Sequence, residues 1–161
     1  MDMPILKPLP IKTRGKSAFG RLKAWITEVR TWEVAENWEY QLDPDTRIII
    51  PKGFVFDGAS IPRILWAVLS PTGLLLIQGL IHDFGYKYDY LWAVNKGEGE
   101  KYIKIYEGKG QDFWDELFYR VGREVNEMKV INALAWLPLS LFGFIAWNNH
   151  RDNDYDDLKP E

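Results

Sequence analysis

The residues with the clearest chemical potential in this sequence are a histidine and an aspartate that follow an apolar run. Eight mostly apolar positions, 74–81, precede His82 and Asp83. An imidazole can act as a general acid or base near neutral pH. A carboxylate in apolar surroundings must be solvated or paired, because an isolated buried charge is costly. The pair therefore needs a compensating group from elsewhere in the fold.

The apolar run predicts a helix from Leu74 to about Tyr90 that passes through the middle of a domain. On this helix Gly79 and Gly85 lie about one turn before and after His82. Two residues without side chains leave room beside the imidazole for a ligand or for another backbone.

A second predicted helix, 111–128, offers the carboxylate that could reach His82. Asp112 and Glu116 point away from its apolar face, whereas Asp115 lies at the border of that face beside Trp114. Asp115 is therefore the acidic residue of this helix that we expect to point inward.

An antiparallel packing of the two helices allows a hydrogen bond between Asp115 and His82. Such a bond fixes the tautomer of the ring and leaves the other ring nitrogen to activate water. Asp83 could then bind a hard divalent cation such as calcium, with help from backbone carbonyls. The structural alternative is a buried His82 held by a carboxylate for stability, with Asp83 paired to Lys87 at i+4.

The segment 57–60 permits two interpretations. Asp57 followed by Gly58 suits a tight turn after a strand, and Ser60 before Pro62 suits a helix N-cap. Asp57 either serves only this turn or joins the His82 cluster as a metal ligand. Ser60 is the weaker candidate for a nucleophile, because no nucleophile-elbow motif surrounds it.

The remaining pattern predicts an α+β fold, with a small antiparallel sheet in the N-terminal half and a packed helical C-terminal half. Strands are expected within 21–51, including a hairpin of 38–42 and 47–50 around the turn residues 43–46. A helix is expected after Pro62, ending near 70. Residues 95–110 suit a loop or a short exposed hairpin, and 130–147 suits two core helices that meet at Pro138. The domain limits are 1–20 for a proline-rich arm, 21–149 for one domain and 150–161 for an acidic, disordered tail.

Composition narrows the classes of function. A net charge of −3, with 20 basic and 23 acidic residues interspersed, provides no electropositive surface, so nucleic acid is not an expected partner. The absence of cysteine excludes disulfides and thiolate chemistry. The first ten residues lack the pattern of a signal peptide. Eight residues each of Trp, Tyr and Phe exceed what a small core needs, so some of them suit a partner surface.

Several motifs together resemble the tailed-phage and prophage family known as domain of unknown function 1353. They are Pro-x-Gly-Phe-x-x-Asp-Gly-Ala-Ser-Ile-Pro at 51–62, Trp66, His-Asp-x-x-Tyr at 82–86, and 114–119. The resemblance spans about residues 20–145. It implies a phage origin, location in the virion or the infected bacterial cell, often a position among tail genes, and phage structural proteins as partners.

His82, Asp83 and Tyr86, with Asp115 on a partner helix, are also similar to the site of secreted and parvoviral phospholipases A2. The similarity implies that His82 is the general base and Asp83 a calcium ligand. It also implies that Tyr86 supplies a structural hydroxyl and that Asp115 orients His82. The disulfides and the glycine-rich calcium loop of the secreted enzymes are missing, so 56–60 would have to supply further ligands.

Two functions are expected on these grounds. The first is a tail- or virion-associated protein in which His82, Asp83 and Asp115, joined or not by Asp57, perform metal-assisted hydrolysis of an envelope ester or amide. The second is a non-enzymatic baseplate or tail component in which the same cluster is structural. Membrane contact through 130–147 is a further possibility, because this run approaches the length of a membrane span.

Overall fold

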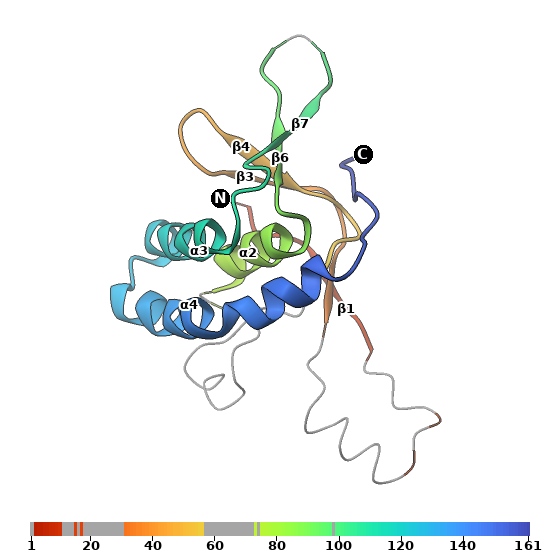
Figure 1. The fold of residues 1–161 in the computed structure, drawn as a ribbon. Coiled ribbons are helices and arrows are strands. Elements are labelled where there is room, and N and C mark those ends of the chain that lie inside the picture. Colours follow the sequence, from red (N-terminus) through yellow and green to blue (C-terminus); the bar gives the residue numbers. More distant parts are fainter. Residues whose placement is uncertain are drawn as a thin grey trace.

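Helices gather on one side of the structure and strands on the other, in an α+β arrangement (Figure 1). The computed structural model describes residues 2–10, 15, 17, 31–56, 73, 75–97 and 99–161. The fold class predicted from the sequence is therefore confirmed. Asp57, Ser60, the strands expected within 21–30 and the helix expected after Pro62 lie outside the described residues.

The strands form two antiparallel sheets rather than one. The first has the order β1 (Leu6–Pro8), β2 (Trp32–Val34) and β5 (Val55–Phe56). The second has the order β3 (Trp38–Gln41), β4 (Arg47–Ile50), β6 (Leu91–Val94) and β7 (Tyr102–Ile105). Strands β6 and β7 form a hairpin, but only β7 and the connecting loop fall within 95–110, where a loop or a short hairpin was expected. Strand β6 joins this hairpin to β4.

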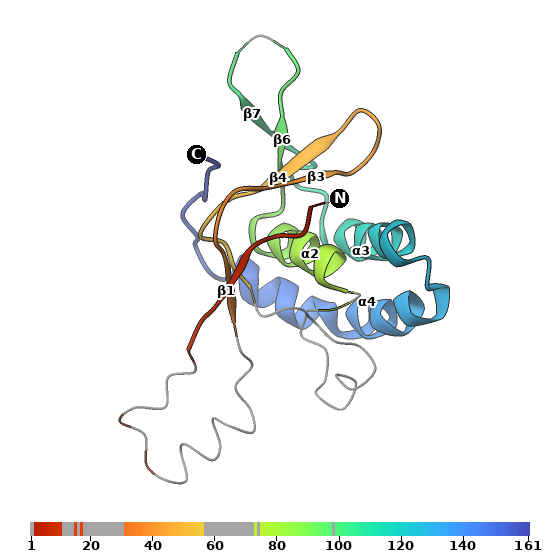
Figure 2. The same cartoon turned by 180° about the vertical axis from the view of Figure 1, so that it is seen from behind.

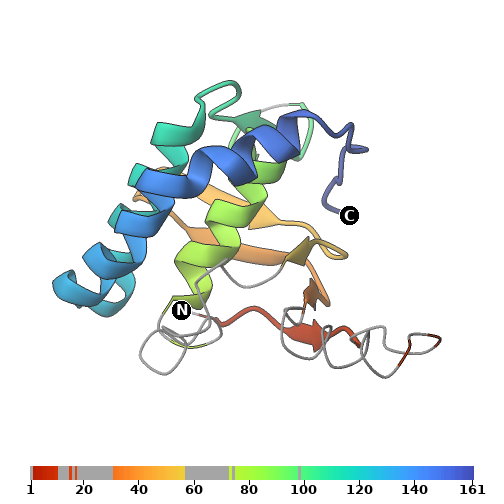
Figure 3. The ribbon, with the colours of Figure 1, turned by 60° about the horizontal axis from the view of Figure 1, so that its bottom comes forward.

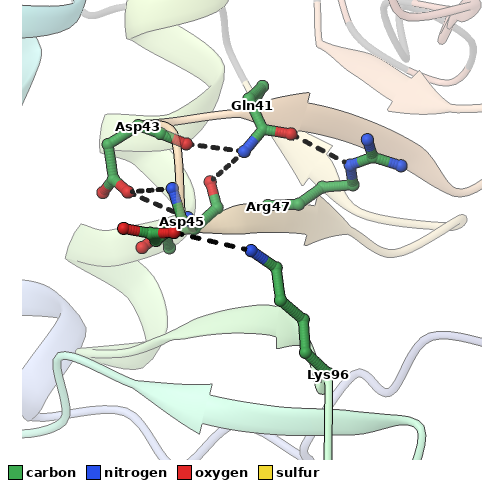
Figure 4. Close-up of polar contacts among 6 residues, drawn as sticks. Gln41, Asp43, Asp45, Arg47 and Lys96 are labelled. Atoms are coloured by element: carbon green, nitrogen blue, oxygen red, sulfur yellow. Dashed lines mark hydrogen bonds and ion pairs between the residues drawn. The ribbon is translucent and has the colours of Figure 1, made fainter.

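The β3–β4 hairpin is set by the side chain of Asp43 at the turn (Figure 4). Its Oδ1 accepts hydrogen bonds from the backbone N–H groups of Asp45, at 3.0 Å, and Thr46, at 2.8 Å. Gln41 bridges the two strand ends, because its Oε1 accepts a bond from Arg47 Nε at 3.2 Å. This turn chemistry is what the Asp-Pro-Asp sequence predicts, and the expected hairpin is confirmed.

Both ends of the chain lie against the sheets. Strand β1 pairs with β2 as an edge strand, which suits its Pro8, since proline cannot donate to a sheet ladder. At the other end, the carbonyl of Leu158 accepts a bond from Trp92 Nε1 at 2.8 Å. Asp157 accepts bonds from Tyr90, at 3.0 Å, and Lys104, at 2.7 Å. The sequence interpretation treats this end as disordered, whereas here it contacts β6 and β7.

Helix α2 (Leu76–Tyr88) is the central element, and α3 (Gln111–Asn126) and α4 (Lys129–Arg151) pack on it. It contacts both of these helices and strands β5 and β6, and in Figure 3 it lies between α4 and the strands. Ten of its 13 residues are buried, as the continuous apolar run predicts. Figure 2 shows the same layers from behind.

Asp89 ends α2 and fixes the start of α3. It adopts a left-handed conformation with φ of 57° as the C-cap residue. Its Oδ1 accepts hydrogen bonds from Trp114 Nε1, at 2.9 Å, and from the N–H of Gly110, at 3.3 Å. One carboxylate thus joins the end of one helix to the first turns of the next.

A buried amide network joins the other ends of the helices. Gln78 donates from Nε2 to Asn132 Oδ1 at 3.1 Å, and Asn132 donates from Nδ2 to Asn126 Oδ1 at 2.8 Å. A Cβ on Gly122 would lie 2.6 Å from Asn132 Oδ1. This glycine therefore makes room for the network.

Helix α4 differs from the prediction, because it continues through Pro138 instead of breaking there. The bend comes later: the parts Lys129–Leu141 and Gly143–Arg151 meet at 54°. A proline removes one backbone donor and crowds the preceding turn, but packing of the helix against α2 and α3 holds the two parts together.

The outer face of α4 carries a stripe of exposed apolar side chains. They are 49% to 73% exposed and comprise Val130, Leu134, Leu137, Leu141, Phe144 and Ile145. No single helix among the described residues has the length and hydropathy to cross a membrane. The two bent parts of α4 pass that test only when they are taken together, by length and composition.

Gly85 on α2 packs directly against Trp114 on α3. Room was expected beside His82 for a ligand or for another backbone, and at Gly85 a side chain fills it, because a Cβ there would collide with the indole of Trp114. Trp114 is itself fully buried. Tight packing of these helices therefore requires glycine at this position.

We expect Gly85→Ala to lower the free energy of unfolding by about 1–3 kcal/mol, the usual cost of overpacking a core. Urea denaturation at 25 °C measures this change. Gly97→Ala is the matched control, because the nearest atom to its added Cβ, Asn95 Oδ1, is 3.4 Å away. Equal stability of the two variants would contradict the packing argument.

Candidate functional site

His82 and Asp115 form a buried hydrogen-bonded pair between α2 and α3. Nε2 of His82 lies 2.9 Å from Oδ1 of Asp115, and both side chains are almost fully buried. This confirms the contact predicted from the helix faces, including the choice of Asp115 over Asp112 and Glu116, both of which are exposed. An ionised carboxylate only accepts hydrogen bonds, so Nε2 carries the hydrogen and Nδ1 of the neutral ring keeps its lone pair.

Asp115 accepts two further hydrogen bonds. Tyr86 Oη donates to its Oδ1 at 2.6 Å, and Gln111 Nε2 donates to its Oδ2 at 3.2 Å. Three donors satisfy a carboxylate that would be costly to bury alone. Burial and the hydrogen bond to Asp115 raise the pKa of Tyr86, so this residue stays a neutral donor.

The other ring nitrogen of His82 faces Asp83. Nδ1 is 3.8 Å from Asp83 Oδ1, too far for a direct hydrogen bond, so its lone pair remains available. Asp83 Oδ2 is buried without a hydrogen-bond partner among the described residues. The expected structural pair of Asp83 with Lys87 is not an ion pair here, because the described contacts of Asp83 include His82 but not Lys87.

Opposing effects act on the pKa of His82. Burial lowers this pKa, but hydrogen bonding to Asp115 and the negative charges of Asp83 and Asp115 outweigh burial and raise it above its ordinary value. His82 therefore holds a proton more tightly than a free imidazole. A raised pKa matters for catalysis, because His82 can act as a general base only after it has lost this proton.

His82 and Asp83 line a cavity of about 520 Å³, which is within the range of small-molecule sites. Strand β5 forms one wall and the inner face of α4 forms another. The described lining residues are Thr31, Phe54, Val55, Phe56, His82, Asp83, Tyr86, Lys87, Pro138, Leu139, Gly143, Ala146, His150 and Tyr155. The imidazole is thus buried from bulk solvent but open to this cavity.

His150 also lines the cavity, so both histidines of the chain contribute to its wall. Its Nδ1 lies 3.0 Å from Tyr155 Oη. Burial lowers the pKa of His150. The negative charge of Asp83 opposes burial, and the positive charges of Arg151 and Lys87 lower the pKa further. The sequence interpretation placed His150 in the tail. No local pattern shows that the last turn of α4 returns to the α2 site.

Glycine 143 lets α4 approach this site closely. A Cβ there would collide with the hydroxyl of Tyr86 and lie 3.0 Å from Gln111 Nε2. Arg151, the last residue of α4, donates hydrogen bonds to the backbone carbonyls of Tyr86, at 2.7 Å, and Lys87, at 2.8 Å. Helix α4 is therefore fastened to the part of α2 that carries the site.

A second cavity, of about 540 Å³, lies on the other side of Asp115, between α3 and α4. Asp112, Asp115 and Glu116 line it together with Trp136 and Ser140. Among the described residues no three His, Asp or Glu side chains are grouped so that they could hold a metal ion. Asp83 offers one free carboxylate oxygen, and Asp57, the other expected metal ligand, lies outside the described part of the chain.

The fold and the site define an α+β protein with a His–carboxylate pair at the wall of a partly open cavity. The profile of the family described as "Protein of unknown function (DUF1353)" matches residues 32–138, well over half of the 161 residues. The chain belongs to this family, as its motifs predicted. No curated protein and no solved structure matches the chain.

The two histidines should give opposite pH dependences of stability. The pKa of His82 is higher in the folded protein than in the unfolded chain, so protonation of His82 stabilises the fold. This contribution is complete below the pKa of the unfolded chain and is lost as pH rises through the pKa of the folded protein. The lowered pKa of His150 gives stability that is present above the ordinary pKa and lost as pH falls. We expect the free-energy difference between wild type and His82→Gln to shrink as pH rises above about 6.5.

For His150→Gln the corresponding difference should instead stay constant above about pH 6.5 and shrink as pH falls below it, because the unfolded chain then binds a proton more readily than the folded one. Denaturant unfolding at pH 5 to 9 measures both. Parallel trends for the two variants would rule out the opposed electrostatic environments described above.

Removing the hydroxyl of Tyr86 should strengthen the interaction between Asp115 and His82. Tyr86→Phe leaves the carboxylate with one donor fewer, so we expect the pKa of His82 to rise further and the protein to lose about 1–2 kcal/mol of stability. NMR titration of the two imidazoles measures the pKa, with His150 as internal reference. Tyr102→Phe, in β7, is the control. A fall in the pKa of His82 would contradict the expectation.

Proposed function

We propose that this protein is a phage-encoded, tail- or virion-associated hydrolase that cleaves an ester or amide of the host envelope, with His82 as general base. The hydrolytic part rests on one observation: the His82–Asp115 bond of 2.9 Å at a cavity wall leaves Nδ1 free. The phage and tail part rests on the motifs at 51–62, 82–86 and 114–119 and on the resemblance that they carry.

The proposed reaction needs one base and one orienting carboxylate. Nδ1 of His82 takes a proton from water, and the hydroxide oxygen forms a bond to the carbonyl carbon of the substrate. Asp115 stabilises the resulting imidazolium and holds the ring in place, and Tyr86 and Gln111 hold Asp115. The bond from carbon to the leaving oxygen or nitrogen then breaks, and the proton on His82 passes to the leaving group. The products are an acid and an alcohol or amine.

A divalent metal such as calcium is the cofactor proposed from the sequence. The described residues supply Asp83 and no group of three ligands. They do not by themselves make a metal site, so no step of the proposed reaction depends on a metal.

A second candidate function is a non-enzymatic baseplate or tail component. The observation that favours it is the exposed apolar stripe of α4, which suits contact with phage structural proteins or, through 130–147, with a membrane. In this case the His82–Asp115 pair serves only to hold α2 to α3.

The two functions differ in what substitution of the pair does. Under the hydrolase proposal, His82→Gln and Asp115→Asn each lower kcat/KM by about 10²–10⁴-fold, the usual contribution of a general base and its support. Turnover of p-nitrophenyl esters and of the matching anilides measures this, with circular dichroism to verify folding. Asp112→Asn is the matched control, because it makes the same change on an exposed residue of the same helix.

The pH profile provides an independent check. Because the pKa of His82 is raised, activity should appear on an acid limb whose midpoint lies above the ordinary imidazole value, and Asp83→Asn should move this limb to lower pH. A wild-type protein that turns over no ester or anilide, with variants that lose only stability, would support the structural component instead.

A further inference from the structure

Lys87 presents an ammonium group to the cavity without a carboxylate partner. It lies on α2 one turn after Asp83 and lines the same cavity as His82. In the part of the chain that the structure describes, no carboxylate lies within 4.0 Å of its Nζ. Its contacts are with aromatic rings: Nζ lies 4.7 Å from the ring centre of Tyr155, 5.4 Å from Tyr88 and 5.7 Å from Phe54.

The face of an aromatic ring attracts an ammonium group. The ring carbons have no lone pairs, however, so they do not accept ordinary hydrogen bonds from its three N–H groups. The half-buried position also weakens hydration of this charge, and burial lowers the pKa of Lys87. A partly desolvated cation that lacks a protein anion is suited to bind an anionic group of a ligand.

The rest of the cavity is mainly apolar. Strand β5 and the residue before it contribute Phe54, Val55 and Phe56, and the inner face of α4 contributes Pro138, Leu139 and Ala146. Such walls suit an alkyl or acyl chain, because burial of apolar surface is the main source of affinity in sites of this kind.

We propose that the cavity binds an anionic amphiphile, in which a phosphate or carboxylate group pairs with Lys87 and an apolar chain lies between β5 and α4. This inference rests on the proposed function and specifies its substrate class. Lys87 lies five positions after His82 on α2, about 7.5 Å along the helix axis. The anionic group of the substrate therefore lies several bonds away from the carbonyl that is attacked beside His82.

Three other ionisable groups face Lys87 or its ligand. Asp83 carries a negative charge one turn away, which disfavours an anion beside His82 and favours its placement at the Lys87 end. His150 is electrostatically coupled to Lys87, so an anion bound there raises the pKa of His150. Tyr155 places its ring beside Lys87 and its hydroxyl beside His150.

Binding of non-hydrolysable probes tests this proposal. Octyl phosphate and octanoate represent the two sources of negative charge, 1-octanol is the neutral probe, and inorganic phosphate is the probe without a chain. By calorimetry we expect both anionic amphiphiles to bind wild type at least tenfold more tightly than 1-octanol or inorganic phosphate. Lys87→Met, which keeps the apolar stem, should remove this preference, and Lys87→Arg should retain it.

Lys101→Met is the matched control. Lys101 also lies over an aromatic ring, that of Tyr102 at 4.6 Å, but outside the cavity. Octyl phosphate should in addition raise the pKa of His150 in wild type and not in Lys87→Met, as measured by NMR. Equal binding of 1-octanol and octyl phosphate, or undiminished preference in Lys87→Met, would overturn the proposal.

Failure of hydrolysis is distinguishable from failure of this site. The probes are not turned over, so the binding experiment has the same outcome whether or not His82 is catalytic. Binding through Lys87 in a protein that hydrolyses no ester or anilide would preserve the ligand site and reject the hydrolase. Hydrolysis of anionic and neutral esters at equal rates would preserve the hydrolase and reject the anionic ligand site at Lys87.

Discussion

The buried carboxylate of Asp115 is the interaction on which the arrangement of the helices depends. It lies in the interface of α2 and α3, where an uncompensated charge would be strongly destabilising. Its three hydrogen-bond donors come from both helices: His82 and Tyr86 from α2, and Gln111 from α3 itself. Any relative shift of the two helices by one turn would separate Asp115 from two of these donors, so the polar contact selects one packing register.

The amide network at the other end of the helices has the same effect. Gln78 and Asn132 are fully buried, and a hydrogen bond from Gln78 Nε2 to Asn132 Oδ1 joins α2 to α4. Apolar contacts alone tolerate small displacements, whereas hydrogen bonds with fixed geometry do not. Two polar contacts, one near each end of α2, therefore define how the three helices lie.

Local sequence patterns predicted the part of the site that lies on two regular helices. The contact of His82 with Asp115 could be foreseen because the helical repeat places Asp115 at the border of an apolar face. The fold class and the β3–β4 hairpin followed from strand alternation and turn residues. Each of these predictions depends on neighbours within a few positions along the chain.

The features that sequence reasoning missed are those that depend on distant contacts. Gly85 was interpreted as room for a ligand or for another backbone, but the side chain of Trp114 from α3 occupies that space. His150 was assigned to a tail, because nothing near it in the sequence shows that α4 ends beside α2. The continuity of α4 through Pro138 likewise results from packing on both other helices, which outweighs the local preference of proline to end a helix.

The glycines at the helix contacts have a consequence for how this sequence can diverge. Gly85 faces the indole of Trp114, Gly122 faces Asn132, and Gly143 faces the hydroxyl of Tyr86. In each case a larger residue is acceptable only if its partner becomes smaller or the helices move apart. These positions should therefore vary as pairs in related chains, and a substitution of Gly143 without a change at Tyr86 should be rare.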